Sequence, residues 1–231
     1  MGLRFRRILP IRMTHEGGTG MVSAAEIVAL EDRMTLEWHE KPGVSVEESL
    51  SASAHDAANG EENDWLRLVA RQHRANFDLW HIEDEARTPG ASDARIANVK
   101  RRVDLTNQLR NDLIEELDRE MLGWLEARGL PNPTAPLHSE PPGIMIDRLS
   151  ILALKIYHTK EEAERKDAPV GHAERNRERL AILVEQRNDL AGCLDALWQE
   201  TVAGTRRFKL HRQLKMYNDP TLNPAIYGSR A

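Results

Sequence analysis

Two rows of polar side chains, recurring at steps of three or four residues, are the parts of this sequence best suited to chemistry. The first row consists of His73, Asn76, Trp80, Glu83 and Arg87. Steps of three and four place side chains on one face of an α-helix. An imidazole, an amide, an indole, a carboxylate and a guanidinium on one face would suit the binding of a small polar molecule.

The second row continues this pattern over about five helical turns. It consists of Lys100, Asp104, Asn107, Asn111, Glu115 and Asp118. A turn near Gly90 would fold the two segments into a hairpin, so that Glu83 should approach Lys100. Asn76 and His73 should likewise approach Asp104 and Asn107. This seam has two interpretations, a closed network of paired polar groups or a pocket for a small ligand, and the sequence leaves both open.

If the seam is an enzyme site, its carboxylates and imidazole would transfer protons. The candidates for acid or base are Glu83, Asp104 and His73. Arg87 and Lys100 would bind anionic groups, and Trp80 would stack on a ring. Further ligand-binding candidates are Asn76, Asp84, Asn107, Arg110, Asn111 and, in the later segment "IMIDRLSILALKIYH", Asp147, Arg148 and Lys155.

A metal centre is not predicted from these residues. Metal sites on helices usually show Glu-x-x-His or His-x-x-x-His spacing, and neither occurs around His81 or His158. Two acidic pairs could bind a hard cation such as Mg²⁺. They are Glu83 with Asp84 and Glu115 with Asp118. Because the two pairs should lie far apart along the hairpin, no cofactor is expected, with Mg²⁺ as the one alternative.

Apolar residues recur at helical spacing along most of the chain, which predicts an all-α protein. One globular domain is expected over 23–231, after a disordered basic arm or an over-extended start at 1–22. Within the domain we expect an N-terminal helix at 23–40, where Ser23 and Glu26 form a capping box, and a linker at 41–62. A first helical hairpin at 63–130 precedes a Pro-rich connection at 131–143. A second hairpin at 144–204 precedes a basic segment and irregular tail at 205–231.

The two hairpins resemble each other at one fixed offset. "RNDLIEELD" at 110–118 returns as "RNDLAGCLD" 77 positions later, and "LWHIEDEAR" at 79–87 matches "IYHTKEEAE" at the same offset. His81 then aligns with His158. We interpret this pattern as a duplicated helical hairpin that forms an elongated four-helix bundle. The alternative is chance similarity between amphipathic helices of like composition.

The overall composition excludes several classes of protein. The net charge of −5 and the isoelectric point near 6.0 make a nucleic-acid partner unexpected. No apolar run is long enough to span a membrane. The single Cys193 fits a reducing, cytoplasmic setting, and its apolar surroundings predict burial. A glycine-rich phosphate loop and a Gly-x-Ser-x-Gly elbow are both missing.

Four segments together resemble the bacterial domain-of-unknown-function family 4254. They are "NFDLWHIEDEAR", "VKRRVDLTNQLRNDLIEELD", "PPGIMIDRLSILALKIYH" and "KMYNDPTLNPAIY". The likeness covers roughly 27–227 and departs from the family pattern at Pro141, where the family has threonine. It implies a helical fold and genes that often lie beside glycosyltransferases of cell-surface polysaccharide assembly. It also implies that Asn76, Trp80, Glu83, Asp84, Arg87, Lys100, Asp104, Asn107, Arg110 and Asn111 belong to the family signature.

Two functions follow as expectations. The first is a non-catalytic interaction or ligand-binding protein in surface-polysaccharide assembly, with a protein partner or self-association through its helices. The second is an enzyme that acts on a sugar or nucleotide-sugar at the polar seam through carboxylate acid–base chemistry. Whether the seam opens into a cavity or closes on itself distinguishes the two.

Overall fold

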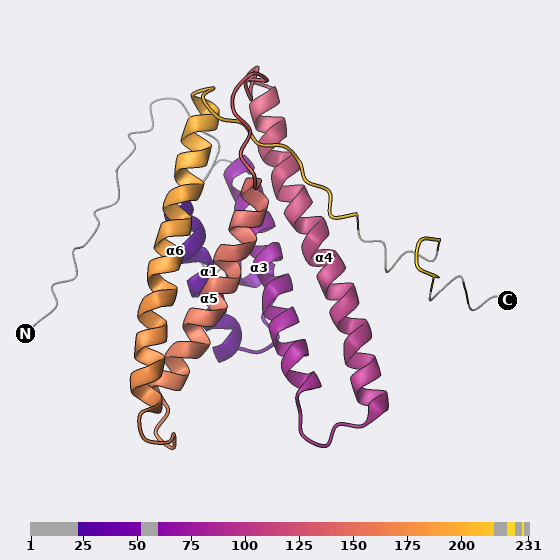
Figure 1. Ribbon diagram of the computed structural model, residues 1–231, viewed down its shortest axis with the longest axis vertical. Coiled ribbons are helices and arrows are strands. Elements are labelled where there is room, and N and C mark those ends of the chain that lie inside the picture. The colour runs from indigo at the N-terminus through magenta and orange to yellow at the C-terminus, as the bar shows by residue number, and fades with distance from the viewer. Residues whose placement is uncertain (1–22, 52–59, 215–220, 225–227, 229–231) are drawn as a thin grey trace, which may run out of the picture.

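The computed structural model describes residues 23–51, 60–214, 221–224 and 228, and over these residues the protein is all-α, as predicted. Its helices are α1 (Ala24–Glu40), α2 (Val46–Ser51), α3 (Gly60–Ala86), α4 (Asp93–Glu126), α5 (Pro142–Glu164) and α6 (His172–Val202). Figure 1 shows two long hairpins, α3 with α4 and α5 with α6, which lie close together at one end and diverge toward their turns. Helix α1 packs against α3, α5 and α6.

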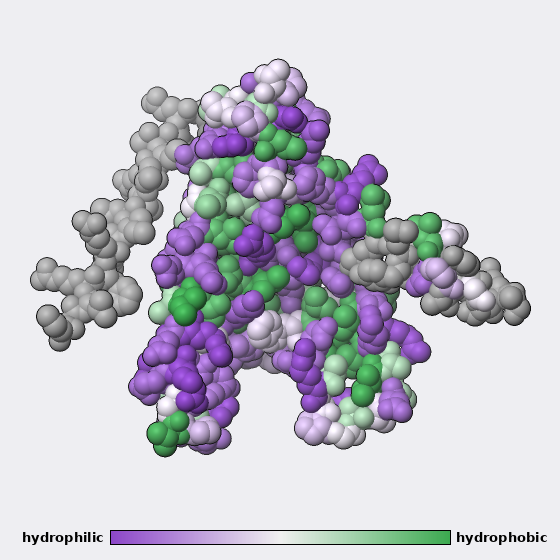
Figure 2. Space-filling view, in the orientation of Figure 1, coloured by the Kyte–Doolittle hydropathy of each residue, from purple (hydrophilic) through white to green (hydrophobic). Residues whose placement is uncertain are grey.

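Helix α1 begins where its sequence predicts. The Ser23 side chain accepts the backbone N–H of Glu26, and the Glu26 carboxylate accepts the backbone N–H of Ser23 at 2.9 Å. The capping box is therefore complete. The apolar face of α1, which includes Ile27, Met34 and Trp38, is buried in the core between the hairpins. Hydrophilic residues cover most of the outer surface, and hydrophobic ones show along the middle of the molecule (Figure 2).

The two nine-residue copies, 110–118 and 187–195, each end in an aspartate that makes the same kind of hydrogen bond. Asp118 of α4 accepts the backbone N–H of Gly143 in the first turn of α5 at 2.7 Å. Its counterpart Asp195 of α6 accepts the backbone N–H of Ala24, the first residue of α1, at 2.8 Å. Each carboxylate therefore satisfies a helix N-terminus that belongs to another helix.

The arginines of the two copies also make equivalent contacts. Arg110 forms an ion pair with Asp147 of α5, and Arg187 pairs with Asp32 of α1 at 2.7 Å. The repeated sequence thus fastens α5 to α4 and α1 to α6. These contacts support the interpretation of the two hairpins as a duplication.

The connections differ in places from the expected pattern. The expected linker at 41–62 contains α2, and the end of that range already belongs to α3, while 52–59 lie outside the described residues. The basic segment is irregular up to residue 214 and is anchored by a bridge between Leu137 and Arg207. The expected arm at 1–22 and most of the tail after residue 214 also lie outside the described residues.

Two further features concern the surface of the helices. Cys193 is exposed, so the predicted burial is wrong, and its neighbour Leu194 is the residue of α6 that is buried in the core. Among the helices of the described residues, none combines the length and the apolar character that crossing a membrane requires.

Candidate functional site

The inner residues of the predicted seam form a closed network around Asp147 of α5. Its Oδ1 atom accepts hydrogen bonds from Gln72 at 2.7 Å, from Asn76 at 3.0 Å and from Arg110 at 2.7 Å. Asp147 and Asn76 are both buried. The bond to Asp147 raises the pKa of the Arg110 guanidinium. The amides and the guanidinium are thus committed to one carboxylate, which holds α3, α4 and α5 together.

His73 lies at the centre of the same network and has no free ring nitrogen. Its Nδ1 lies 2.7 Å from Ser150 Oγ, and its Nε2 lies 2.9 Å from Thr35 Oγ1. Burial lowers the pKa of His73 to about 3, so the imidazole is neutral. The expectation that His73 approaches Asp104 or Asn107 of α4 is wrong, because both of its ring nitrogens contact residues of α1 and α5.

A fully buried carboxyl group, which the sequence analysis did not single out, adds to this polar layer. Glu31 of α1 has no exposed surface, and neither of its oxygens has a hydrogen-bond partner. Burial, followed by the charge of Asp32, raises the pKa of Glu31 well above its usual value. Burial without a partner therefore disfavours the charged form of this carboxyl group.

The outer residues of the seam form exposed pairs along single helices. Glu83 lies 3.5 Å from Arg87, one turn along α3, and Lys100 pairs with Asp104, one turn along α4. The expected approach of Glu83 to Lys100 is therefore wrong. A pair that crosses the hairpin near its turn is Glu85 with Arg102, at 2.7 Å. Exposed pairs of this kind contribute little to stability.

The remaining candidates are dispersed over the surface and the seam. Arg148 pairs with Glu140 at 3.0 Å, and both side chains are about half exposed. Asp84 and Lys155 are exposed, Asn107 is half-buried and Asn111 is buried. The structure therefore does not gather the predicted acids, bases and cations at one cavity.

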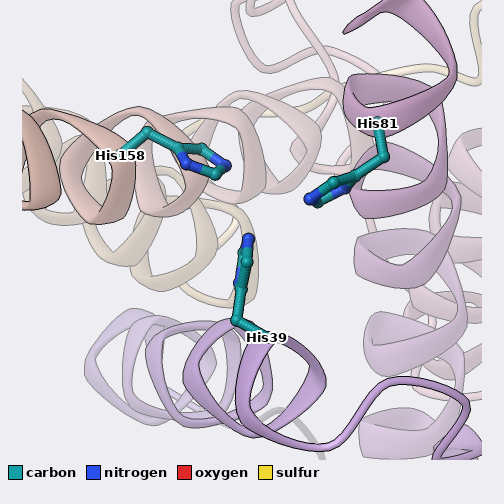
Figure 3. Close-up of side chains that lie close together, drawn as sticks. All are labelled: His39, His81 and His158. Carbon is teal, nitrogen blue, oxygen red and sulfur yellow. The ribbon is translucent and has the colours of Figure 1, made fainter. Parts of the chain in front are cut away.

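A different cluster forms where α1, α3 and α5 meet. His39, His81 and His158 come from these three helices, and one ring nitrogen of each lies within 4.8 Å of the other two. Figure 3 shows the three imidazoles pointing toward a common centre. All three side chains are half-buried.

Hydrogen bonds fix the orientation of each imidazole. Nδ1 of His39 donates to the Thr35 carbonyl oxygen at 2.7 Å, and Nδ1 of His81 donates to the Phe77 carbonyl oxygen at 2.8 Å. Nδ1 of His158 donates to the carboxylate of Glu161 at 2.9 Å. With the proton assigned to Nδ1 by these acceptors, the lone pair of each ring lies on Nε2. Carbonyl and carboxylate groups play this role behind the histidine ligands of metal sites.

Aromatic rings hold the imidazoles from the sides. Tyr157 stacks on His39 with ring centroids 4.1 Å apart, and Trp80 stacks on His158 at 4.9 Å. Burial lowers the pKa of His39, which favours the neutral form that a metal ligand needs. Nε2 of His39 and Nε2 of His158 are buried and have no hydrogen-bond partner.

The spacing of the three nitrogens fits a first-row transition ion. A triangle with sides of 4.8 Å has its centre about 2.8 Å from each corner, whereas zinc–nitrogen bonds measure about 2.0–2.1 Å. Each nitrogen would have to move inward by less than about 1 Å. Neutral imidazoles suit Zn²⁺, Cu²⁺, Ni²⁺ and Fe²⁺, whereas Mg²⁺ requires oxygen ligands.

The comparison with family models covers 66–210, more than half of the chain. The matching model is described as "Protein of unknown function (DUF4254)". The chain belongs to this family. Comparison with curated proteins and with solved structures gives no significant match.

The DUF4254 segment supplies two of the three histidines. His81 and His158 lie within 66–210, and they are the equivalent residues of the two hairpins at the offset of 77. His39 comes from α1, which precedes the DUF4254 segment. The complete cluster therefore requires α1 to dock against the family domain.

Sequence reasoning missed this cluster because it searched for ligands along one helix. Each helix here contributes one histidine, so no spacing within a helix reveals the set. A signal was nevertheless present: each histidine directly follows a large aromatic residue. The dipeptides are Trp38-His39, Trp80-His81 and Tyr157-His158. The acidic pairs that were considered for Mg²⁺ do not form a cluster with one another among the described residues.

A pocket lies at the other end of α3 from the histidines. It has a volume of about 620 Å³ and is bounded by Trp65 of α3, Trp124 of α4 and Trp198 of α6. Trp65 lies 16 residues before His81, which corresponds to about 24 Å along the helix. Gly123 of α4 leaves the pocket wall without a side chain. This pocket contains none of the residues predicted for the seam.

Proposed function

We propose that this DUF4254 protein binds a transition-metal ion, with Zn²⁺ as the reference ion, through His39, His81 and His158. The observation that carries the proposal is the convergence of three imidazoles whose Nδ1 atoms are all engaged. Two of the three opposing Nε2 atoms are buried without a partner. A buried polar atom without a partner is costly, and a metal ion at the centre would satisfy these nitrogens together.

Metal stoichiometry tests the proposal directly. The full chain is stripped with a chelator, titrated with Zn²⁺ by calorimetry and then analysed by elemental mass spectrometry after gel filtration. We expect one tightly bound ion per chain in the unmodified protein, and at least about a tenfold weaker affinity in His81→Gln, because ligand loss is severe at such sites.

A matched control uses a histidine outside the cluster. His172 is half-buried and pairs with the Glu162 carboxylate at 2.7 Å, much as His158 pairs with Glu161. His172→Gln should therefore bind Zn²⁺ like the unmodified protein. Equal binding by the His81→Gln and His172→Gln variants would contradict the proposal.

The Trp-lined pocket supports a second function, the binding of a small ligand. Ring centroids of Trp124 and Trp198 lie 5.3 Å apart, and the guanidinium of Arg128 lies 3.7 Å from the Trp124 centroid. Aromatic walls with a few charged groups are typical of sites for ring-shaped ligands. Combined with the family resemblance, this supports a sugar or nucleotide-sugar ligand and a role beside surface-polysaccharide assembly, either alone or with a protein partner.

Tryptophan fluorescence tests this second function. We expect uridine diphosphate glucose to change the emission of the unmodified protein, and Gly123→Leu to remove the change by filling the pocket. Gly192→Leu is the control, because Gly192 also lies in a helix with open space at its Cβ position but does not line the pocket. The same titration curve for all three proteins would contradict ligand binding in this pocket.

A further inference from the structure

The histidine cluster offers an incomplete coordination shell. Zinc in proteins takes four ligands, and structural sites supply all four from the chain. In the part of the chain that the structure describes, no fourth histidine, cysteine or carboxylate joins His39, His81 and His158. A bound ion would therefore keep one position for a ligand from outside.

The carboxylate beside the cluster is already engaged. Glu161 accepts the Nδ1–H of His158 at 2.9 Å, so it lies behind the imidazole rather than at the centre. Burial, followed by the charge of Glu161, raises the pKa of the neighbouring Tyr157. The arrangement orients His158 and leaves the fourth position without a ligand from Glu161.

The cluster lies at the edge of the core. His39, His81 and His158 are each half-buried as residues, while Nε2 of His39 and Nε2 of His158 are themselves buried. The rings of Tyr157 and Trp80 cover His39 and His158 from the side, and these contacts keep the nitrogens in place. A held set of three histidines without a fourth protein ligand is the arrangement of catalytic zinc sites, in which water takes the remaining position.

We propose that the loaded cluster is an open, catalytic type of metal centre, which activates water for attack on a small electrophilic carbonyl compound such as an activated ester. This inference rests on the proposed metal binding and adds the reaction class to it. A zinc ion lowers the pKa of a water ligand to about 7. An ion held by the three histidines would therefore supply hydroxide near neutral pH.

The reaction balances without a further reactant. A water molecule at the open position gives one proton to the buffer, and its oxygen forms a bond to the carbonyl carbon of the ester. The bond from that carbon to the alcohol oxygen then breaks, and the alcohol part leaves with the electron pair. The remaining proton of the attacking hydroxide passes to the leaving alcohol oxygen, or to the buffer where a phenolate leaves. The products are a carboxylate and the alcohol or phenolate, and a second water molecule restores the starting state.

The protein contributes the geometry and the electronic character of the ligands. The carbonyl oxygens of Thr35 and Phe77 and the Glu161 carboxylate accept the three Nδ1 protons. These bonds hold each ring with its Nε2 toward the centre and increase the basicity of the ligands. The half-buried position limits the centre to small or protruding substrates.

Two measurements on the full chain test the inference. In the first, the protein is loaded with Co²⁺ and its visible spectrum is recorded while azide is added. An open position should take up azide and change the absorption bands. In the second, hydrolysis of 4-nitrophenyl acetate is followed with zinc-loaded protein, with chelator-treated protein and with His81→Gln. We expect a zinc-dependent rate about tenfold or more above both comparisons.

The outcomes separate this inference from the proposed function. If one Zn²⁺ binds per chain but azide leaves the cobalt spectrum unchanged, the site is closed and the inference is overturned, while metal binding stands. The inference is also overturned if the zinc-loaded, unmodified protein hydrolyses the ester no faster than the His81→Gln variant at the same zinc concentration. If the unmodified chain binds no metal, both proposals fail. His172→Gln, which keeps the cluster, should retain both the azide response and the hydrolysis.

Discussion

Asp118 of α4 accepts a hydrogen bond of 2.7 Å from the backbone N–H of Gly143, at the start of α5. The contact is buried on both sides, and the second carboxylate oxygen of Asp118 has no partner. Burial raises the pKa of Asp118 to about 7, although the Gly143 N–H acts in the opposite direction. A helix is thus fastened by a carboxyl group that titrates near neutral pH.

The first prediction concerns the pH dependence of stability at Asp118. Between about pH 4 and pH 7 the folded protein binds a proton at Asp118 that the unfolded chain has released, so stability falls as pH rises through this window. Asp118→Asn keeps the shape and removes this titration. Relative to the unmodified protein, the variant should gain up to about 1.4 kcal/mol of unfolding free energy per pH unit in this window. Urea unfolding at pH 5 and pH 7 measures the difference, and a constant difference would contradict the raised pKa.

The second prediction concerns the close approach of α5 to α4. A Cβ atom on Gly143 would lie 2.6 Å from the carbonyl oxygen of Ile114 and 2.9 Å from Asp118 Oδ1. Gly143→Ala should therefore destabilise the protein by about 1–3 kcal/mol, because the helices must separate. Gly192→Ala is the control, since its Cβ meets nothing within 4 Å and should gain about 0.5–1 kcal/mol. Thermal unfolding of the two variants should shift in opposite directions, and a shift in the same direction would argue against the close contact.

The third prediction concerns His73, whose pKa is shifted in the other direction. Between about pH 6.5 and about pH 3 the unfolded chain binds a proton at His73 that the folded protein does not. The stability that a neutral His73 provides is fully present above this window and is lost as the pH falls through it. His73→Gln should cost about 1–3 kcal/mol at pH 7.5, because buried partners lose their hydrogen bonds.

The cost of His73→Gln should shrink as the pH is lowered. Urea unfolding at pH 5 and pH 7.5 compares the two proteins, and the loss should be smaller at pH 5 by up to about 1.4 kcal/mol per unit below 6.5. An equal loss at both values would mean that the folded protein binds a proton at His73 as readily as the unfolded chain. Asp118→Asn serves as the comparison, because its pH dependence runs in the opposite direction.

Much of the fold could be predicted because its signals are local. The capping box of Ser23 and Glu26 marks the start of α1, and the glycines at 90 and 129 mark helix ends where the backbone has positive φ. The repeat of 77 residues identifies Asp118 and Asp195 as equivalent. Their partners, Gly143 and Ala24, could not be predicted, because no pattern in the sequence states which helix N-terminus meets which carboxylate.

The candidate site was harder to predict because it depends on the rotation of each helix. The hairpin pattern gives His73 a position along the axis of α3 from which it could meet α4. However, α3 is rotated about its axis so that His73 faces Thr35 and Ser150. Glu83 and Lys100 are rotated outward in the same way and pair along their own helices. The histidine cluster combines three helices, so it becomes visible only once their packing is known.

The fourth prediction concerns the effect of zinc on α1. His39 is the ligand that α1 contributes, and a ligand set from three helices ties α1 to both hairpins. Zn²⁺ at about 100 times its dissociation constant should add about 2.7 kcal/mol to stability, because a bound ligand stabilises only the folded state. Hydrogen exchange should therefore slow in the last turns of α1, near His39, as well as around His81 and His158.

His39→Gln supplies the control for this effect. In this variant, zinc should no longer slow exchange in α1, since the remaining two histidines both belong to the hairpins. His172→Gln, outside the cluster, should respond to zinc like the unmodified protein. Protection of α1 by zinc in the His39→Gln variant would show that the ion acts elsewhere, and it would remove α1 from the metal site.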